Sequence, residues 1–467
     1  MVRHLQSLSG NTSVVFEVLS PYIVVPIMDD LDEVDNHALN RDAATIMLDA
    51  SCMVTVEISV DRGPSQQVGE RRSVMKIFHI CALIILASSI CVGSGLGRSG
   101  PVSGFGEFSE VSSEIHLELP SSEQVETLMR RVNAFQLANP YKDPKTGQPV
   151  EYDRNWIRAT YYTGVAAMYL VTRAPDLRRQ LFDWCEKHDW QVGSETYSMA
   201  NRLTCGQTYL QLYLLEPKQS MIRSLQEWVD SGLPGSPSSQ DVWYFEGGRM
   251  WCDSLYTAPP TLVMLAKATG EKRYLDYMNR MYWDVYSHLY DREADFFYRD
   301  DRFIGQRTKR GKKIFWSRGN GWVIAGLARI LPHLPRENKG YQRFLALYRK
   351  MAEAVAGAQE ADGLWRSNLA DALQFPNPES SGSAFFCYAL AWGINQRILS
   401  AEVYLPVVVK AWRGLVGCVH ESGKLGWVQP VGANPEATNY DSTHEYATGA
   451  FLLAGSEMIK LVRSHGR

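Results

Sequence analysis

Aromatic side chains and single charged residues gather in two short strings of the chain. The first is RMWCDSLY, residues 249–256, and the second is WSRGNGW, residues 316–322. Aromatic faces stack on pyranose rings and carboxylates transfer protons, so this combination is typical of a site that processes a sugar. Two later segments add polar candidates, namely Arg366, Ser380, Ser381 and Ser383, then Asp441, His444, Glu445 and Tyr446.

Asp253 in the first string is the strongest candidate for proton transfer. Its neighbours Trp251, Cys252 and Leu255 offer apolar or weakly polar surroundings, which raise the pKa of a carboxyl group. An aspartate before an apolar helical run is equally suited to cap the N-terminus of that helix. Two interpretations of Asp253 therefore stay open, a general acid and a helix cap.

Arg318 and Trp322 in the second string lie four residues apart, so they share a face if the segment is helical. An arginine beside an aromatic surface suits a sugar that carries a carboxylate. Trp251, Trp316 and Ser383 complete the substrate-binding candidates of these loops. The glycines of the second string are equally consistent with close packing of helix ends.

Six apolar, helix-like runs follow these loops at fairly even spacing. Each begins after a small or turn residue, at Gly164, Gly206, Pro260, Gly321, Gly382 and Gly449. Between them lie turn-rich segments and helical patterns with charges on one face. Alternation of an almost entirely apolar helix with an amphipathic one predicts an inner and an outer ring of helices. We therefore predict an all-α fold, an (α/α)6 barrel or six-hairpin toroid, with the candidate site residues before the inner helices.

The barrel is predicted to occupy residues 121–467. Ser121 and Gln124 have the spacing of a capping box, and apolar residues recur after them at helical intervals, which places the first outer helix there. Further outer helices are expected near 175–189, 219–231, 272–289, 341–358 and 401–418.

Composition and charge disfavour several other classes of protein. The 467 residues are 45% apolar and include 13 tryptophans, enough for one large core, and a formal net charge of −3 gives no reason to expect nucleic-acid binding. No nucleotide-binding or metal-binding motif is present and the histidines are isolated from one another, so we expect no metal and no other cofactor. The cysteines of the barrel are expected to be buried free thiols.

The first 120 residues differ from the rest. Residues 1–74 show no continuous period and are left without a fold. From Met75, basic residues flank an apolar run that small residues follow, the pattern of a secretory signal peptide at 75–95. Because such a signal acts at the beginning of a chain, residues 1–74 are expected to be absent from the mature protein, and 96–120 form a linker. We expect an exported, periplasmic or extracellular protein.

Two other interpretations of this segment are open. Residues 77–97 carry no Asp, Glu, Lys or Arg and are long enough to span a bilayer, but their glycines and serines disfavour stable membrane insertion. A lipid anchor at Cys91 is disfavoured by the large Ile90 before it. The oligomeric state is not predicted.

Residues 121–462 resemble glycoside hydrolase family 105, the unsaturated rhamnogalacturonyl hydrolases, and more distantly the unsaturated glucuronyl hydrolases of family 88. The matching strings are WCDSLYTAPP, FWSRGNGW, ESSGSAFFCYALAWGIN, GWVQPVGA and EYATGAFLLAGSEM, in this order. The resemblance implies an (α/α)6 barrel, as the repeats do independently. It also implies a glycosidase that removes a 4,5-unsaturated uronic acid from the non-reducing end of lyase-generated oligosaccharides, of the pectic rhamnogalacturonan type.

The chemistry that the resemblance implies is hydration of a vinyl ether. An aspartate protonates C4 of the unsaturated sugar, water adds at C5, and the resulting hemiketal collapses. No oxocarbenium ion at C1 is needed, so the carboxylate spacing of ordinary glycosidases does not apply. By its motif, Asp253 matches the family's proton donor, while Arg318 and Trp322 match residues that line the subsite for the unsaturated sugar.

Two positions depart from the family pattern. Members commonly have an aspartate a few residues before the glycine of the second inner helix, where this chain has Asn201, which is kept as a substrate-binding candidate. Many have a histidine in the connection from the third to the fourth inner helix, where this chain has Arg299. Arg299 is always charged and planar, and could instead bind the carboxylate of the uronate. The alternative function is a non-catalytic barrel that binds uronic-acid oligosaccharides.

Overall fold

The chain divides into two compact units, Met1–Ser112 and Ser113–Arg467. The computed structural model describes strands at 3–5, 12–18, 42–49 and 52–60, and residues 119–142, 153–195, 199–233, 250–337 and 340–465. The predicted signal peptide at 75–95 and the lipid-anchor candidate Cys91 lie outside the described residues, as does most of the predicted linker.

The first unit contains a four-stranded antiparallel sheet. Its strands are β1 (Arg3–Leu5), β2 (Thr12–Val18), β3 (Asp42–Asp49) and β4 (Cys52–Val60), in the spatial order β1-β2-β4-β3. No fold was predicted for this segment. The signal that could have found it is the strict alternation of apolar and polar residues in β4, from Val54 to Val60, which is typical of a strand.

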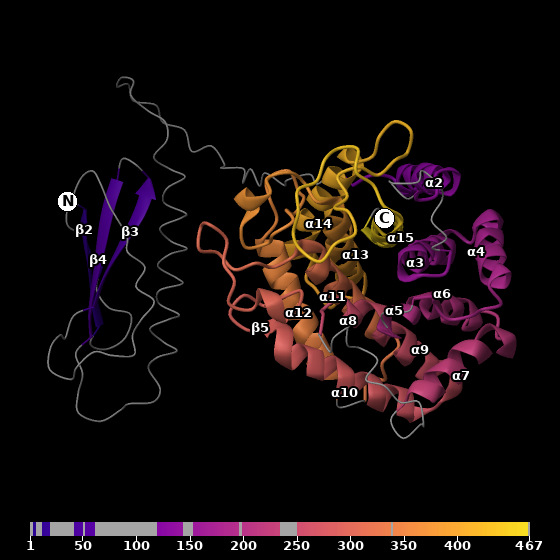
Figure 1. Ribbon diagram of the computed structural model, residues 1–467. Helices are drawn as coiled ribbons and strands as arrows, with labels where there is room; N and C mark the ends of the chain where they lie inside the picture. Colours follow the sequence, from indigo (N-terminus) through magenta and orange to yellow (C-terminus); the bar gives the residue numbers. More distant parts are fainter. Residues whose placement is uncertain are drawn as a thin grey trace. The chain divides into compact units, whose positions relative to one another are not determined.

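The second unit is the predicted double ring of helices (Figure 1). The inner helices are α3 (Trp156–Thr172), α6 (Thr204–Tyr213), α9 (Pro259–Thr269), α11 (Ser317–Ile330), α13 (Ser380–Asn395) and α15 (Glu445–His465). The outer helices are α2 (Ser122–Ala138), α4 (Pro175–Lys187), α7 (Arg223–Gly232), α10 (Lys272–Leu289), α12 (Tyr341–Gly357) and α14 (Ala401–Gly417). Each predicted apolar run falls in an inner helix and each predicted amphipathic segment in an outer one. The (α/α)6 barrel is confirmed.

The inner helices close into a ring because each packs against the next and the last returns to the first. Helix α3 contacts α6, and the contacts continue through α9, α11 and α13 to α15, which packs against α3. Figure 1 shows α4, α7, α10 and α12 outside this ring. The loops that precede the inner helices, where the candidate site residues were predicted, therefore belong to one closed ring.

The inner and outer helices differ in how much of their surface is buried. Every residue of α13 from Ser380 to Ile394 is buried, since this helix packs against α11, α15 and outer helices. In α12 one face is buried, with Phe344 and Met351 on it. An apolar helix suits the first environment and an amphipathic helix the second. The first outer helix, α2, begins with the predicted capping box, in which Ser121 and Gln124 exchange side-chain-to-backbone hydrogen bonds.

Gly164 in α3 and Gly449 in α15 let the first and last inner helices approach closely. A Cβ atom on Gly164 would lie 2.3 Å from the carbonyl oxygen of Gly449, and one on Gly449 would lie 2.3 Å from the carbonyl oxygen of Thr160. The obstacle is backbone in both cases, so a side chain at either position would force the helices themselves apart.

We expect Gly164→Ala to destabilise the barrel by about 1–3 kcal/mol, the usual cost of overpacking a core. Gly357→Ala at the last residue of α12 is the matched control, because a Cβ atom there meets nothing within 4 Å. Urea unfolding of the two variants measures the difference. Equal stability would contradict the close crossing of α3 and α15.

The cysteines of the barrel are buried free thiols, as predicted: Cys185, Cys205, Cys252, Cys387 and Cys418. Among the helices that the structure describes, none is both long and apolar enough to cross a bilayer.

Candidate active site

The segment that carries Asp253 is fixed by a neighbouring loop. Trp251 forms an isolated antiparallel bridge with Asp300, and the Cys252 amide donates a hydrogen bond to the Arg299 carbonyl at 2.9 Å. This second loop follows the hairpin of β5 (Tyr290–Asp291) and β6 (Phe296–Phe297) and leads into the 3-10 helix η2 (Asp301–Phe303). These backbone contacts bring the predicted site residues Trp251, Asp253 and Arg299 together.

The Asp253 carboxyl group is largely removed from solvent. Its side chain is 18% exposed, and its Oδ2 lies 3.9 Å from Nε of Arg299. Its Oδ1 accepts a hydrogen bond from the Cys252 thiol at 3.4 Å. Burial raises the pKa of Asp253 above its ordinary value, against the opposing charges of Arg299 and Arg318. The group therefore holds its proton to a higher pH than an ordinary aspartate does.

Asp253 does not cap a helix. It precedes the single-turn helix α8 (Ser254–Thr257) with helical backbone angles, φ −62° and ψ −27°, and its side chain accepts no capping hydrogen bond. The third inner helix, α9, begins later, with Ala258 at its N-cap position. The capping interpretation is wrong, which leaves this carboxyl group available for chemistry.

Arg299 is a buried cation held by Asp300. Its Nη1 donates a hydrogen bond to Asp300 Oδ2 at 2.6 Å, and its guanidinium carbon lies over Trp251, 5.4 Å from the ring centre. Asp300 also accepts hydrogen bonds from Nε and Nη2 of Arg302, each at 2.8 Å. Burial favours the neutral form of Asp300, but the hydrogen bonds from Arg302 and Arg299 outweigh it and lower the pKa. Binding of a uronate by Arg299 stays a prediction.

Arg318 is enclosed by two aromatic rings and two backbone carbonyls. Its guanidinium carbon lies 4.3 Å from the ring centre of Trp316 and 4.8 Å from that of Tyr446, and its side chain is almost fully buried. Nη1 donates to the carbonyl of Gln429 at 2.8 Å, and Nη2 to the carbonyl of the next residue at 2.9 Å. These contacts hold the Arg318 side chain in a fixed place near Trp316. Contact with the substrate stays a prediction for both Arg318 and Trp316.

Trp322 lies in a cluster of aromatic rings. Its ring centre is 4.4 Å from that of Phe385, 4.8 Å from Tyr256, 6.0 Å from Trp156 and 6.1 Å from Tyr446. A Cβ atom on the neighbouring Gly321 would lie 3.1 Å from Cβ of Phe385, so close packing of helix ends is confirmed for this glycine. Stacking of Trp322 on a sugar stays a prediction, since its side chain is 3% exposed.

Gln429 connects these side chains and was not singled out from the sequence. Its Oε1 accepts a hydrogen bond from Nε1 of Trp316 at 2.8 Å, and its carbonyl accepts from Arg318 and from the Tyr446 hydroxyl. Its only signal was its place in the family-like string GWVQPVGA. Hydrogen bonds between residues so distant in the chain cannot be inferred from local pattern.

Comparison with known proteins decides the family. The model of Glycosyl Hydrolase Family 88 matches residues 128–462. This protein belongs to Glycosyl Hydrolase Family 88. A curated relative from Formosa agariphila, named unsaturated 3S-rhamnoglycuronyl hydrolase, is 36% identical to this family 88 protein over 326 residues, covering 66% of this chain and 85% of the relative.

Solved structures agree with the family. One described as glycosyl hydrolase family 88 from Bacteroides vulgatus is 31% identical, with a TM-score of 0.66, over 73% of this chain and 100% of that one. Another, described as a polysaccharide lyase, is 32% identical, with the same TM-score of 0.66, over 73% of this chain and 98% of that one. The predicted resemblance is confirmed, with family 88 supplying the matching model, and the glycosidase class with it.

Asn201 and Ser383 take different places in the family 88 barrel. Asn201 is buried in the short helix α5 (Met199–Arg202), which contacts α8 beside Asp253. Ser383 lies at the start of α13, where its hydroxyl donates to the Glu379 carbonyl at 2.7 Å and accepts from the Trp365 amide at 2.9 Å. The Ser383 hydroxyl is thus used to hold the helix start. A substrate contact stays a prediction for both residues.

Glu195 is a second buried carboxyl group that sequence reasoning missed. One oxygen accepts a hydrogen bond from the Trp156 amide at the start of α3, and the other has no hydrogen-bond partner within the described residues. Burial raises the pKa of Glu195 to about 7, against its hydrogen bonds and the nearby Arg202 and Arg154 charges. Trp156 packs against Trp322, so Glu195 lies near the aromatic cluster. A single glutamate in a turn carries no sequence signal that its carboxyl group is buried.

His444 is a neutral imidazole in the same region. Burial, with a contribution from the Arg318 charge, lowers its pKa to about 3. Nδ1 accepts a hydrogen bond from the Glu445 amide at 3.1 Å, so the ring proton belongs on Nε2, which finds no partner in the described part of the chain. The ring is stacked between Tyr141 and Tyr446, at 4.2 and 4.8 Å. His444 therefore offers an N–H donor whose charge does not change at neutral pH.

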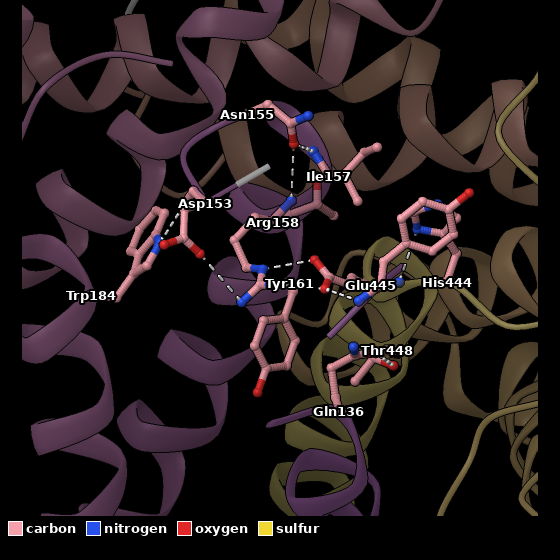
Figure 2. A network of polar contacts seen from close by, with 12 residues as sticks. Gln136, Asp153, Asn155, Ile157, Arg158, Tyr161, Trp184, His444, Glu445 and Thr448 are labelled. Atoms are coloured by element: carbon pink, nitrogen blue, oxygen red, sulfur yellow. Dashed lines mark hydrogen bonds and ion pairs between the residues drawn. The ribbon is translucent and has the colours of Figure 1, made fainter. Parts of the chain in front are cut away.

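A buried ion pair supports this side of the site (Figure 2). Nε and Nη2 of Arg158 in α3 donate to the two carboxylate oxygens of Glu445 in α15, each at 2.7 Å. The Tyr141 amide also donates to Glu445 at 3.0 Å, and Asp153 lies 3.8 Å from the other side of Arg158. The pair fixes the start of the last inner helix against the first.

A groove of about 670 Å³ is lined by Asp153 and Arg158 from this ion-pair network and by residues of α2 and α4 such as Arg130 and Gln180. Asp253 does not line it. Arg130 in this groove pairs with Asp176 at 3.0 Å. Asp253 stays the candidate for proton transfer, because a desolvated carboxyl group that caps no helix is a better indicator of catalysis than the volume of a surface groove.

Proposed function

We propose that this family 88 glycosidase uses Asp253 to hydrate the vinyl ether of an unsaturated uronic acid. The protein removes this residue from the non-reducing end of oligosaccharides that a lyase has produced. The observation that carries the proposal is the Asp253 carboxyl group itself, which is mostly buried, caps no helix and has a raised pKa. It also lies in the string that matches the family's proton donor.

The proposed reaction consumes one water molecule. Asp253 transfers its proton to C4, and the C4–C5 double bond supplies the electron pair for the new C–H bond. Water adds at C5 and returns a proton to the Asp253 carboxylate. The C5–O5 bond of the hemiketal then breaks, leaving a ketone at C5 and a hydroxyl on C1. The C1 centre finally becomes an aldehyde as the linked sugar leaves.

Two cations balance the acid strength of Asp253. Burial favours the protonated form that must exist before the transfer. Arg299, at 3.9 Å, and the buried Arg318 favour the carboxylate that exists after it. A general acid is most effective when its pKa lies near the working pH, and these opposing influences support that role.

We propose that the preferred substrate is an unsaturated uronic acid linked to a rhamnose with a sulfate on O3. The support is the name of the Formosa agariphila relative, in which we interpret 3S as this sulfate. The rhamnogalacturonan product expected from the sequence also joins an unsaturated uronic acid to rhamnose, but lacks the sulfate. The presence of this anionic group is therefore one difference between the two products.

The ultraviolet absorbance of the C4–C5 double bond tests activity and substrate together. Purified protein would be mixed with the sulfated product, the unsulfated rhamnogalacturonan product, and chondroitin- and alginate-type products. We expect absorbance to fall fastest with the sulfated product, with kcat/KM about tenfold or more above the others, because a hydrogen bond to a charged group contributes about 1.5–3 kcal/mol. Equal or lower kcat/KM for the sulfated product would overturn the substrate proposal.

Two other outcomes would overturn the reaction itself. Rising absorbance with an intact polysaccharide would indicate a lyase, the activity named for one solved neighbour. Binding of the products without any absorbance change would favour the non-catalytic barrel.

We also propose that the enzyme is exported and acts in the periplasm or outside the cell. The support is the signal-peptide pattern at 75–95. Mass spectrometry of the N-terminus of the protein from its native cells tests this, and a mature protein that retains Met1 would contradict it.

A further inference from the structure

Arg299 lies between two carboxylates at unequal distances. Its Nη1 is 2.6 Å from Oδ2 of Asp300, whereas its Nε is 3.9 Å from Oδ2 of Asp253. The first contact is a hydrogen bond and the second is too long to be one. Arg299 is therefore bound by Asp300 and acts on Asp253 only through space.

Asp300 is itself held firmly in place. It is fully buried and accepts from the Arg302 amide at 3.1 Å as well as from Nε and Nη2 of Arg302, each at 2.8 Å. Its backbone pairs with Trp251, two residues before Asp253. The carboxylate that holds Arg299 is thus positioned on the same backbone framework as the proton donor.

A proton donor requires this separation. An arginine in a two-point ion pair with a carboxylate stabilises the ionised form strongly, and an ionised Asp253 has no proton to transfer. Among the residues that the structure describes, the groups that act on Asp253 are Arg299 and Asp300 from the loop after β6, Arg318 from α11 and Cys252 from its own segment. Of these, Asp300 contributes the negative charge that offsets the two cations.

We propose that Asp300 is a positioning residue that keeps Arg299 from pairing directly with Asp253, so that Asp253 retains its proton in the working enzyme. The inference rests on the proposed role of Asp253 as the donor. It also accounts for Arg299 at a position where a histidine is common among the resembling families. A permanent cation beside the donor is compatible with catalysis because a second carboxylate binds it.

The pH dependence of kcat/KM in Asp300→Asn tests this inference. The reaction needs protonated Asp253, so the rate falls as pH rises through the pKa of that group. Loss of the Asp300 charge and release of Arg299 toward Asp253 both lower this pKa. We expect the falling limb to move to lower pH by about one unit or more, the effect of an opposite charge within a few ångströms. The position of the limb is the readout, because movement of Arg299, a substrate-binding candidate, also changes the rate at the acid end.

Two variants separate positioning from a general loss of structure. Asp301→Asn changes an exposed neighbouring carboxylate and should leave the limb where it is. Asp300→Asn combined with Arg299→Gln removes the cation that was released, so the limb should return to the wild-type position or above it. A uniform loss of rate in Asp300→Asn with an unmoved limb would overturn the inference, as would failure of the double variant to restore it.

Infrared titration of the carboxyl group separates this inference from the proposed function. The band of protonated Asp253 is the one that disappears in Asp253→Asn, and it should titrate at lower pH in Asp300→Asn than in the wild type. A band shifted to lower pH in Asp300→Asn, with no turnover in the wild type, would support the inference and contradict the proposed function. Normal turnover in the wild type, with an unshifted band in Asp300→Asn, would contradict the inference alone.

Discussion

Asp253→Asn is expected to lower kcat by about 10²–10⁴-fold, the usual contribution of a general acid. The amide has nearly the same shape as the carboxyl group but no acidic proton, so C4 of the substrate cannot be protonated. Binding should change little, because the side chain still fills the same space beside Arg299 and the Cys252 thiol. The fall of absorbance on hydration gives kcat, and calorimetry gives the affinity for the unsaturated product.

The matched control for this variant is Asp276→Asn. Asp276 lies on the outer helix α10 in an exposed pair with Lys272, where the two side chains are 59% and 79% exposed. Its kcat should stay within about twofold of the wild type, because exposed pairs contribute little. Full activity in Asp253→Asn would exclude Asp253 as the donor, and the unassigned carboxyl group of Glu195 would become the next candidate.

Glu445→Ala is expected to lower the free energy of unfolding by about 3–5 kcal/mol, the usual cost of leaving one member of a buried ion pair without its partner. The Glu445 side chain is 1% exposed and that of Arg158 is 14% exposed, so water can replace little of the lost contact. The Tyr141 amide also loses its acceptor. Urea unfolding followed by tryptophan fluorescence measures the loss.

A double variant shows whether the loss comes from the unpaired charge. Arg158→Met with Glu445→Leu removes both charges and fills similar volumes, so it should be more stable than Glu445→Ala, because apolar replacements of buried pairs are often neutral. Asp276→Asn again serves as the exposed control, with an expected change below about 1 kcal/mol. A loss in Glu445→Ala no larger than that of the control would mean that water screens Arg158 effectively.

The double ring could be predicted from sequence because its rule is local. An inner helix such as α13 is apolar on all sides, and an outer helix such as α12 is apolar on one, and both patterns are visible within a few turns of chain. The same reasoning missed the sheet of the first unit. There the alternation in β4 extends over a few residues only, and the other strands do not share it clearly.

The candidate site could be predicted only in part. Asp253 stood out because its neighbours in sequence are also its neighbours in space. Arg299 binds its chain neighbour Asp300, but its distance to Asp253 depends on how two loops pair, and no local pattern encodes that pairing. Gln429 and Glu195 were missed for the same reason, since their partners lie far away in the chain.

The burial of the aromatic residues could not be predicted from the sequence either. Trp322 was predicted beside the sugar from its spacing with Arg318, and the spacing correctly placed it on an inner helix. Its position among the side chains of Trp156, Tyr256 and Phe385 depends on three other helices, α3, α8 and α13. A helical period predicts which face a residue occupies, but it does not predict how much of that face is covered.

The closure of the ring has a consequence for how the protein is made. Helix α15 supplies Glu445 to the ion pair with Arg158 and Gly449 to the crossing with Gly164. The first inner helix, α3, therefore gains these contacts only after α15 has been synthesised. Until then its apolar surface has no final partner, and a chain that depends on such distant contacts folds late. A ribosome must release the chain through α15 before the barrel can close. For a protein that we propose to be exported, that delay keeps the chain in an unfolded form that a secretion channel can accept.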